Sequence, residues 1–354
     1  MIKFSVKPNP DFSHLEKVFL RTRKLDRAVI FELFSNIEDE VLEYLGIEAP
    51  RGSAEEIGEE NFLKRHIIYN YNLGYDFVNV WCRNGMNFSA KAVAAVGQDG
   101  KERHYQQAGI SVISDRRDFE NYVWPDMVGG DYSLLEKARK LLPDGMKVVT
   151  GYPGILLIVM YLLGHEGMSF KLFEDPRLVE DVFNEVGSRI VKHLEICAQH
   201  DTVGTVQLGD DLGFCTQTLF SPETYRKYLF PWHKKAVDVI HAAGKTAFLH
   251  ACGNRSQIMQ DIVDCGWDAI HSFEDKISPI WEVKEEWGDK ISVLGGFDMD
   301  KISTFNEQQI RAHSRLLIEK CGRSGWAIGT GNSVANYVPV ENFLCMIDEA
   351  FNAW

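Results

Sequence analysis

The chain of 354 residues is long enough to bury a large core, and its hydrophobic (45%) and charged (25%) fractions are typical of a soluble globular enzyme. Its formal net charge of −13 argues against nucleic acid as the main partner, because binding phosphates requires a basic face. The same charge makes a strongly anionic substrate less favourable unless a local basic pocket overrides it.

The N-terminal segment MIKFSVKPNPDF has no apolar core, so the sequence predicts no secretory signal and a cytoplasmic protein. The longest apolar run, from Gly154 to Gly164, is far too short for a membrane span and predicts a buried helix. The seven cysteines are scattered and odd in number, which favours reduced thiols over a disulfide framework. Most of them should be small buried residues, with Cys252 as the exception.

Eight short apolar segments alternate with amphipathic helical patterns along the chain. Their β-branched and aromatic residues are typical of strands that are covered on both faces. The predicted strands are residues 28–33, 76–81, 147–151, 204–209, 246–251, 267–272, 291–296 and 326–331. Eight such strands with helical crossovers in one uninterrupted chain predict an α/β fold, a (β/α)8 TIM barrel that forms a single domain over residues 1–354.

Helical patterns fill the intervals between these strands. Residues 176–200 carry apolar positions at helical spacing, and residues 221–244 form a second long helical segment. Ser221 is the predicted N-cap of the second segment, and Gly244 is its predicted C-terminal stop.

A long insertion after the second strand, about residues 81–143, interrupts the alternation. Within it, Asp99-Gly100 predicts a hairpin turn, because both central residues of that turn need positive φ. We expect the insertion to cover the mouth of the barrel, although an addition to the scaffold without contact to substrate is nearly as plausible.

Polar side chains gather where the later predicted strands end, which is where barrel enzymes place their active sites. The strand interiors, in contrast, are apolar. The candidate catalytic residues at these ends are Gln207, Asp210, Asp211 and Asn332, and the candidate metal ligands are His250, Cys252 and Glu274.

His250 and Cys252 form the core of the predicted site. Residues two apart on an extended strand point to the same face, and an imidazole with a thiolate is a ligand pair that suits Zn²⁺. A His-x-Cys spacing alone is a weak signal, and a core histidine beside a buried thiol is the structural alternative. Its position at a strand terminus, followed by Gly253, strengthens the metal interpretation.

Carboxylates on neighbouring strands would complete this site. Glu274 follows the next strand and is the expected third ligand or ligand-positioning group, with a surface role as its alternative. Asp210 and Asp211 are adjacent, so at most one of them should face the centre. That one is a candidate general base, and capping of the next loop is the structural alternative.

At this point the sequence is recognisable by four runs, and it resembles the uroporphyrinogen decarboxylase superfamily over nearly its whole length from about Lys24. The runs are GDDLGFCTQTLFSPETYRKYLFPWHK, AGKTAFLHACGN, ISVLGGFD and VPVENF. The HACGN segment is similar to a branch of zinc-dependent methyltransferases that work with corrinoid proteins. Members act on coenzyme M or on methoxylated compounds.

This resemblance implies specific ligands and partners. In the branch, zinc is held by a His-x-Cys pair and a later cysteine near the eighth strand, so His250 and Cys252 carry over directly. Glu274 matches an acidic position that a related zinc site in cobalamin-independent methionine synthases also uses. The corrinoid would be supplied by a partner protein, because the chain has no recognisable cobalamin-binding domain of its own. The protein is also expected to bind no membrane, and a homo-oligomer is possible.

One position departs from the pattern of the branch. Where the later cysteine is expected, the chain has Thr330, and Cys321 lies in the preceding predicted helix, out of reach of the mouth. A site with one thiolate fewer is harder and less anionic. It is better suited to polarising an ether oxygen than to activating a thiol, and the metal itself could be absent.

The preferred function is therefore methyl transfer between a small substrate and a protein-bound corrinoid, with two alternatives left open. Four aromatic residues near predicted strand ends could line a pocket for a methoxyarene, namely Phe34, Trp81, Phe297 and Trp326, although each could equally be core. A porphyrinogen decarboxylase is disfavoured, because the first predicted strand is followed by FSNIEDE, without arginine, and the second ends at Trp81 rather than at a carboxylate. A degenerate barrel that only binds a ligand or a corrinoid protein is the second alternative.

Overall fold

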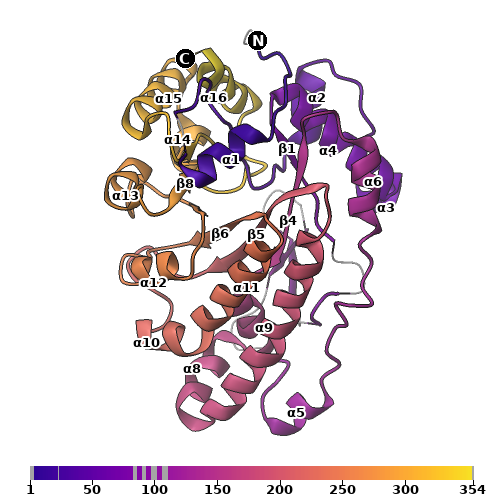
Figure 1. Ribbon diagram of the computed structural model, residues 1–354, viewed down its shortest axis with the longest axis vertical. Coiled ribbons are helices and arrows are strands. Elements are labelled where there is room, and N and C mark those ends of the chain that lie inside the picture. The colour runs from indigo at the N-terminus through magenta and orange to yellow at the C-terminus, as the bar shows by residue number, and fades with distance from the viewer. Residues whose placement is uncertain are drawn as a thin grey trace.

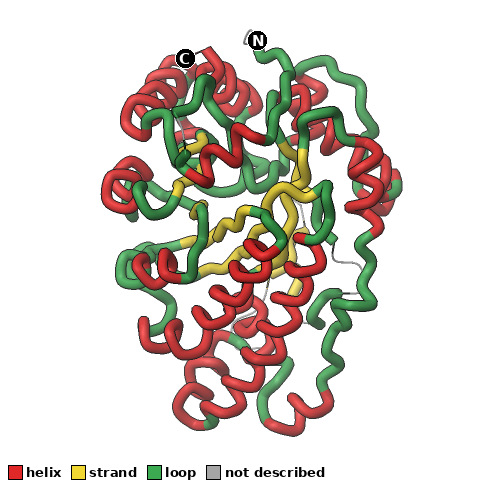
Figure 2. Tube along the Cα trace, viewed as in Figure 1, coloured by secondary structure: helices red, strands yellow, loops and turns green. Residues whose placement is uncertain are grey.

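A seven-stranded parallel sheet forms the centre of the computed structural model, with helices packed around it (Figures 1 and 2). The structure describes residues 4–22, 24–82, 86–89, 93–96, 102–105 and 111–352. In sheet order the strands are β1 (Phe77–Asn79), β4 (Lys147–Pro153), β5 (Val203–Asp211), β6 (Thr246–Cys252), β7 (Ala269–His271), β8 (Ser292–Leu294) and β9 (Trp326–Ala327).

The order β1-β4-β5-β6-β7-β8-β9 follows the chain, and each neighbouring pair is parallel. Parallel strands that follow the chain order and are joined by helical crossovers are the arrangement of a (β/α)8 barrel, and the seven strands here form a half-barrel of this kind. Seven of the eight predicted strands therefore correspond to strands of this sheet. The first predicted segment, 28–33, contributes only an isolated parallel bridge between Ile30 and Ile328.

The helices and helical turns lie before, between and after these strands. They are α1 (Ser13–Leu20), α2 (Glu38–Tyr44), α3 (Ala54–Ile57), α4 (Glu59–Leu73), α5 (Arg116–Asn121), α6 (Ser133–Leu141), α7 (Ile155–Leu163), α8 (His165–Glu174), α9 (Pro176–Ala198), α10 (Pro222–Thr224), the π-helical turn η1 (Tyr225–Leu229), α11 (Phe230–Ala242), α12 (Met259–Asp264), α13 (Ile280–Trp287), α14 (Met299–Thr304), α15 (Glu307–Cys321) and α16 (Val340–Asn352).

Local sequence explains several of these boundaries. Ser221 caps α10 by accepting a hydrogen bond from the backbone N–H of Thr224, as predicted. The predicted helix 221–244 is one helical segment, but it contains η1. Pro231 follows that turn and cannot donate an i→i−4 hydrogen bond, which accounts for the local widening of the helix.

The segment predicted as an insertion contains a second, two-stranded sheet. Strand β2 (Val93–Val96) pairs antiparallel with β3 (Glu102–Tyr105), as a hairpin requires. The predicted turn at Asp99-Gly100 lies outside the described residues. Among the described residues no single helix could cross a membrane, although the bent pair α7 and α8 would pass by length and composition together.

Aromatic side chains pack together on the inner face of the curved sheet, below the carboxyl ends of its strands. Phe31 packs against Phe77 at 5.5 Å and against Phe248 at 5.3 Å between ring centroids. On its other side it packs against the imidazole of His271 at 5.4 Å. These closely packed rings lie between the apolar core and the polar strand ends, and they restrict the movement of His271.

Candidate metal centre

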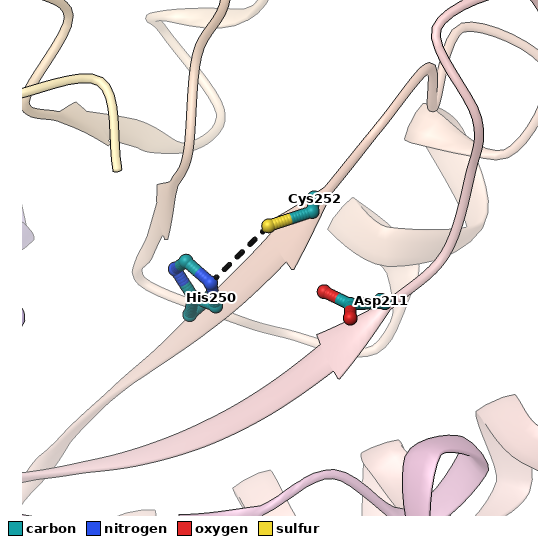
Figure 3. Close-up of side chains that lie close together, drawn as sticks. All are labelled: Asp211, His250 and Cys252. Carbon is teal, nitrogen blue, oxygen red and sulfur yellow. Dashed lines mark hydrogen bonds between the residues drawn. The ribbon is translucent and has the colours of Figure 1, made fainter. Parts of the chain in front are cut away.

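The register of β5 and β6 brings three ligand-type side chains to one face (Figure 3). Asp211 pairs with Cys252, and Gly209 pairs with His250, so residues of the same parity stand side by side. Gly209 has no side chain, which leaves space beside the imidazole. Asp211, His250 and Cys252 therefore converge where both strands end.

These three side chains form a compact cluster. One ligand atom from each of Asp211, His250 and Cys252 lies within 4.8 Å of the other two. His250 Nε2 lies 3.4 Å from Cys252 Sγ. A nitrogen, a sulfur and a carboxylate oxygen at this spacing match the donor set of a zinc site with an open position.

The sulfur of Cys252 is surrounded by groups that can donate hydrogen bonds. Ser272 Oγ lies 3.5 Å away and Asn332 Nδ2 lies 3.4 Å away. Burial, with the nearby Asp211 carboxylate, raises the pKa of the Cys252 thiol to about 11. Burial also raises the pKa of Asp211. A thiol with so high a pKa stays protonated near pH 7 unless a cation stabilises its thiolate. The two hydrogen-bond donors would then stabilise the negative charge on that sulfur.

His250 contacts a second imidazole on the next strand. His250 and His271 are in register on β6 and β7, and their Nδ1 atoms lie 2.8 Å apart. Burial lowers the pKa of His250 to about 4 and also lowers that of His271, so both rings are neutral near pH 7. A neutral imidazole is the form that binds a metal.

Thr330 occupies the position where the resembling branch has its later cysteine. It is fully buried, and its backbone N–H donates to Glu32 Oε1 at 2.7 Å. Its hydroxyl contacts both Glu32 Oε2 and the backbone carbonyl of Asn332. Burial raises the pKa of Glu32 to about 8. This position therefore anchors a hydrogen-bond network instead of supplying a thiolate.

A cavity of about 770 Å³ opens beside the cluster. Gln207 lines it together with Asp211 and His250, and Phe34 and Trp81 lie in its wall. Gln207 is 2% exposed, and its Oε1 atom has no hydrogen-bond partner among the described residues. The other two aromatic candidates, Phe297 and Trp326, are buried in the core instead.

Glu274, the third ligand expected from the sequence, is not a member of this cluster. Strand β7 ends at His271, and Ser272 adopts a left-handed φ of 86° that redirects the chain. Glu274 then lines a separate cavity of about 300 Å³ together with Arg255. The structure instead places Asp211 beside His250 and Cys252.

Asp210 points to the opposite face of β5, as the alternation of a strand requires. Its carboxylate is fully buried and accepts hydrogen bonds from the backbone N–H groups of Ile155 and Leu157 at 3.1 and 3.0 Å. It also contacts His233 Nε2 at 2.9 Å. The residue holds the start of α7, which precedes β5 in the chain, and does not line the cavity, so it supports an earlier helix and does not cap the next loop.

Sequence reasoning assigned no role to three residues of this network, Glu32, His271 and Ser272. His271 could have been found from the register of neighbouring strands, because paired residues on two parallel strands point to the same side of the sheet. It ends β7 directly opposite His250, so a register of parallel strands would have placed the two imidazoles together. Glu32 carried no comparable signal, because its partner Thr330 is 298 residues away.

Comparison with known proteins places the chain in a family. The uroporphyrinogen decarboxylase (URO-D) family matches residues 108–352. A methylated-thiol–coenzyme M methyltransferase of Methanosarcina mazei is 23% identical over 231 residues, covering 63% of this chain and 59% of that protein. The methylcobamide:CoM methyltransferase MtaA of Methanosarcina barkeri is 27% identical over 130 residues, 36% of each chain. The match thus spans less than two thirds of the length of either relative.

Solved structures show the same fold. A methyltransferase from Methanosarcina mazei superimposes with a TM-score of 0.69 at 16% identity, covering 97% of this chain and 98% of its own. A B12-independent methionine synthase from Shewanella sp. W3-18-1 gives a TM-score of 0.51 at 12% identity, covering 85% and 89%. The family match extends over more than two thirds of the sequence and includes every strand of the sheet from β4 to β9. The chain belongs to the uroporphyrinogen decarboxylase family.

Proposed function

We propose that this protein is a zinc-dependent methyltransferase that moves a methyl group between a small substrate and a corrinoid carried by a partner protein. The observation that carries the proposal is the Asp211–His250–Cys252 cluster at the rim of the cavity. The two curated relatives, both named as coenzyme M methyltransferases, support the same reaction class. The substrate is a thiol or a methoxylated compound.

The residues divide the work by their position. His250, Cys252 and Asp211 would hold Zn²⁺, and Ser272 and Asn332 would hydrogen-bond the thiolate. The metal would supply Lewis acidity toward the heteroatom that carries or receives the methyl group. The unpartnered amide oxygen of Gln207 would orient the substrate from the cavity wall.

The charges in the cavity disfavour the decarboxylase alternative. Five carboxyl groups line it among the described residues: Glu32, Glu38, Asp39, Glu40 and Asp211. The one arginine in this lining, Arg65, is already paired with Glu38 and Asp39 at 3.3 Å. A polycarboxylate substrate would find no free guanidinium among these residues.

We also infer that residues 28–33 act as the eighth strand of a closed barrel. The bridge from Ile30 to Ile328 supports a junction with the segment after Trp326 of β9. On the other side, Asn79 of β1 donates to the backbone carbonyl of Glu32 at 3.2 Å. The ring of Phe31 fills the interior between these edges.

Metal content tests the proposed centre directly. Purified protein should bind about one zinc per chain, and Cys252→Ser and Asp211→Asn should each weaken the affinity about tenfold or more, since a lost ligand costs at least as much as a lost supporting group. Glu274→Gln and Cys215→Ser, which change a residue outside the cluster and an exposed cysteine, should leave the affinity unchanged. Competition with a chromogenic chelator measures all five proteins.

The reaction itself needs a second assay. The zinc-loaded protein is mixed with a methylated corrinoid protein and a panel of thiols, which would accept the methyl group, or with a cobalt(I) corrinoid protein and a panel of methoxyarenes, which would donate it. The absorbance spectrum of the corrinoid reports methyl transfer in both cases. A spectrum that no member of either class changes would contradict the proposal, as would wild-type protein that binds no zinc.

A further inference from the structure

His271 stands directly behind the metal-binding face of His250. It is fully buried, it ends β7, and its Nδ1 lies 2.8 Å from His250 Nδ1. On its far side, His271 Nε2 lies 3.4 Å from the backbone carbonyl of Thr330. The ring does not line the cavity, and its contact with the cluster is the one to His250, so we expect its effect on the site to pass through His250.

The hydrogen atoms in this chain of contacts can be assigned from the carbonyl. A carbonyl only accepts, so His271 Nε2 must carry the hydrogen that faces Thr330. A neutral imidazole has one ring hydrogen, which leaves His271 Nδ1 as an acceptor. The hydrogen between the two rings must then belong to His250 Nδ1, and His250 Nε2 keeps a free lone pair.

That lone pair points to the metal cluster. His250 Nε2 is the atom that lies 3.4 Å from Cys252 Sγ. We propose that His271 is a positioning residue that fixes His250 in the Nδ1–H tautomer and so presents its Nε2 lone pair to the metal. This inference rests on the proposed zinc site for its purpose, but the tautomer itself is a property of the metal-free protein.

Further contacts hold in place the hydrogen-bond relay, by which we mean the contacts from His250 through His271 to the carbonyl of Thr330. Gly295 has a φ of +84°, and a Cβ there would lie 3.1 Å from His271 Nε2 and 2.3 Å from the carbonyl oxygen of Thr330. The backbone N–H of Thr330 is fastened to Glu32 at 2.7 Å. Gly295 leaves room for this arrangement, and the hydrogen bond to Glu32 holds the backbone of Thr330. The carbonyl of Thr330 then orients His271, and His271 orients His250, as supporting partners commonly do for a metal-binding histidine.

Nuclear magnetic resonance of the metal-free protein tests the assignment. In protein labelled with ¹⁵N-histidine near pH 7, two- and three-bond couplings distinguish the tautomers, and the His250→Gln and His271→Gln variants assign the signals. We expect hydrogen on Nδ1 of His250 and on Nε2 of His271. Hydrogen on Nε2 of His250 would overturn the proposal.

Zinc affinity gives a second readout. His271→Phe keeps a ring but removes the acceptor, so it should weaken zinc binding by about 10- to 100-fold. His271→Gln can accept from His250 Nδ1 through its amide oxygen and should recover most of that loss. His313→Phe is the matched control, because His313 is a buried histidine that packs against aromatic rings outside the cluster and should leave the affinity unchanged.

The outcomes separate the two proposals. Equal zinc affinity in wild type and His271→Phe, or no recovery in a folded His271→Gln, would overturn the positioning role. If His271→Phe fails to fold, the tautomer of the wild type and the affinity of His271→Gln decide. Wild-type protein that shows the expected tautomers but binds no zinc would contradict the proposed function and leave the hydrogen-bond relay standing.

Discussion

The carboxyl group of Glu32 is held in a buried setting that favours its neutral form. The hydroxyl of Thr330 has one hydrogen and two oxygen neighbours, Glu32 Oε2 and the carbonyl of Asn332. The single hydroxyl hydrogen can be donated to only one of these oxygens, and a hydroxyl that donates to the carbonyl can accept from a protonated Glu32. The raised pKa of about 8, caused by burial, agrees with this assignment.

Stability should therefore depend on pH through Glu32. Its folded pKa of about 8 lies above the ordinary value of 4.5, so the folded protein retains a proton that the unfolded chain loses as the pH rises between these values. The free energy of unfolding falls across that window, by at most about 1.4 kcal/mol per pH unit from this group. Glu32→Gln should abolish this contribution, because its amide can make the same two hydrogen bonds.

Urea unfolding of metal-free wild type and Glu32→Gln at several pH values measures the effect. The difference between the two proteins cancels the titration of all other groups. It should change in favour of the variant as the pH rises and level off above the pKa of Glu32. A difference that stays constant from acidic to alkaline pH would contradict the neutral carboxyl group.

At this scale the sequence was informative where two residues share one strand. The spacing of His250 and Cys252 put both on one face, and the adjacency of Asp210 and Asp211 required them to face opposite ways. Partners on different strands were harder, because their meeting depends on register and on where a strand stops. Glu274 was expected in the site because the end of β7 and the left-handed turn at Ser272 are not visible in the sequence.

Strand β5 uses two adjacent aspartates for two different elements. Asp211 faces the cavity, whereas Asp210 accepts from the first backbone N–H groups of α7. Gly154 precedes this helix, and a Cβ there would lie only 1.8 Å from the Asp210 carboxylate. The glycine thus permits a close contact that satisfies otherwise unpaired donors and places a negative charge at the positive end of the helix.

Asparagine substitutions should separate these two roles. Asp210→Asn should lower the free energy of unfolding by about 3 kcal/mol, because it weakens a buried, charge-assisted network. Asp211→Asn should leave stability unchanged or slightly higher near pH 7, since burial raises the pKa of Asp211 and disfavours its charged form. Denaturant unfolding of both metal-free variants measures this, and equal losses would contradict the division of roles.

Elements followed from the sequence more reliably than their edges. Seven predicted strands and the helices between them are present, because short apolar segments and helical periodicity are local signals. Segment 28–33 resembles a strand equally well, yet it pairs through one backbone bridge and the side chain of Asn79. Because Ile30 pairs with a residue near the other end of the chain, the local sequence around 28–33 could not predict how it pairs.

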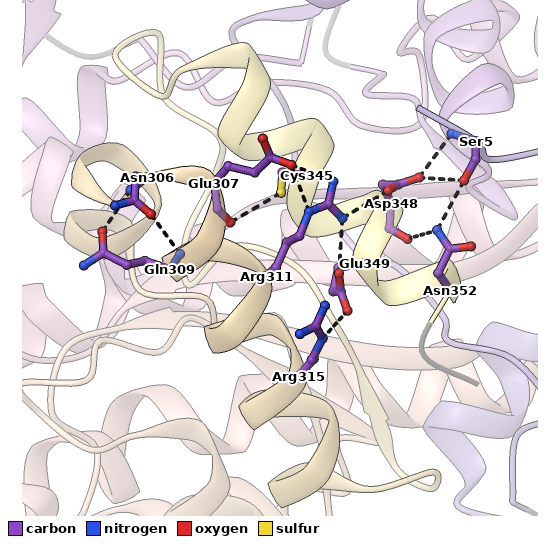
Figure 4. Close-up of polar contacts among 10 residues, drawn as sticks. All are labelled: Ser5, Asn306, Glu307, Gln309, Arg311, Arg315, Cys345, Asp348, Glu349 and Asn352. Atoms are coloured by element: carbon purple, nitrogen blue, oxygen red, sulfur yellow. Dashed lines mark hydrogen bonds and ion pairs between the residues drawn. The ribbon is translucent and has the colours of Figure 1, made fainter. Parts of the chain in front are cut away.

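At the scale of the whole molecule, the two ends of the chain are tied together. The N and C termini lie at the same end of the structure, and helix α16 packs against α15 (Figures 1 and 4). Asp348 of α16 accepts from both the backbone N–H and the hydroxyl of Ser5, at 3.1 and 2.7 Å. The N-terminal segment is thereby fastened to the last helix of the described chain, α16.

Arg311 neutralises the two buried carboxylates on which this junction depends (Figure 4). Its guanidinium lies 3.2 Å from Asp348 and 3.1 Å from Glu349, which are only 5% and 7% exposed. Arg315 also reaches Glu349, at 2.5 Å, but its own side chain is 63% exposed. Arg311 therefore pairs with two buried carboxylates, whereas Arg315 pairs with one of them from a more exposed position.

Methionine substitutions should reveal that difference. Arg311→Met leaves two buried carboxylates without their shared cation and should lower the free energy of unfolding by about 3 kcal/mol. Arg315→Met, in contrast, should cost less than about 1 kcal/mol, because solvent screens an exposed pair. Guanidinium chloride unfolding compares both variants with wild type. Equal losses would mean that the exposed arginine contributes as much to joining the chain ends as the enclosed one.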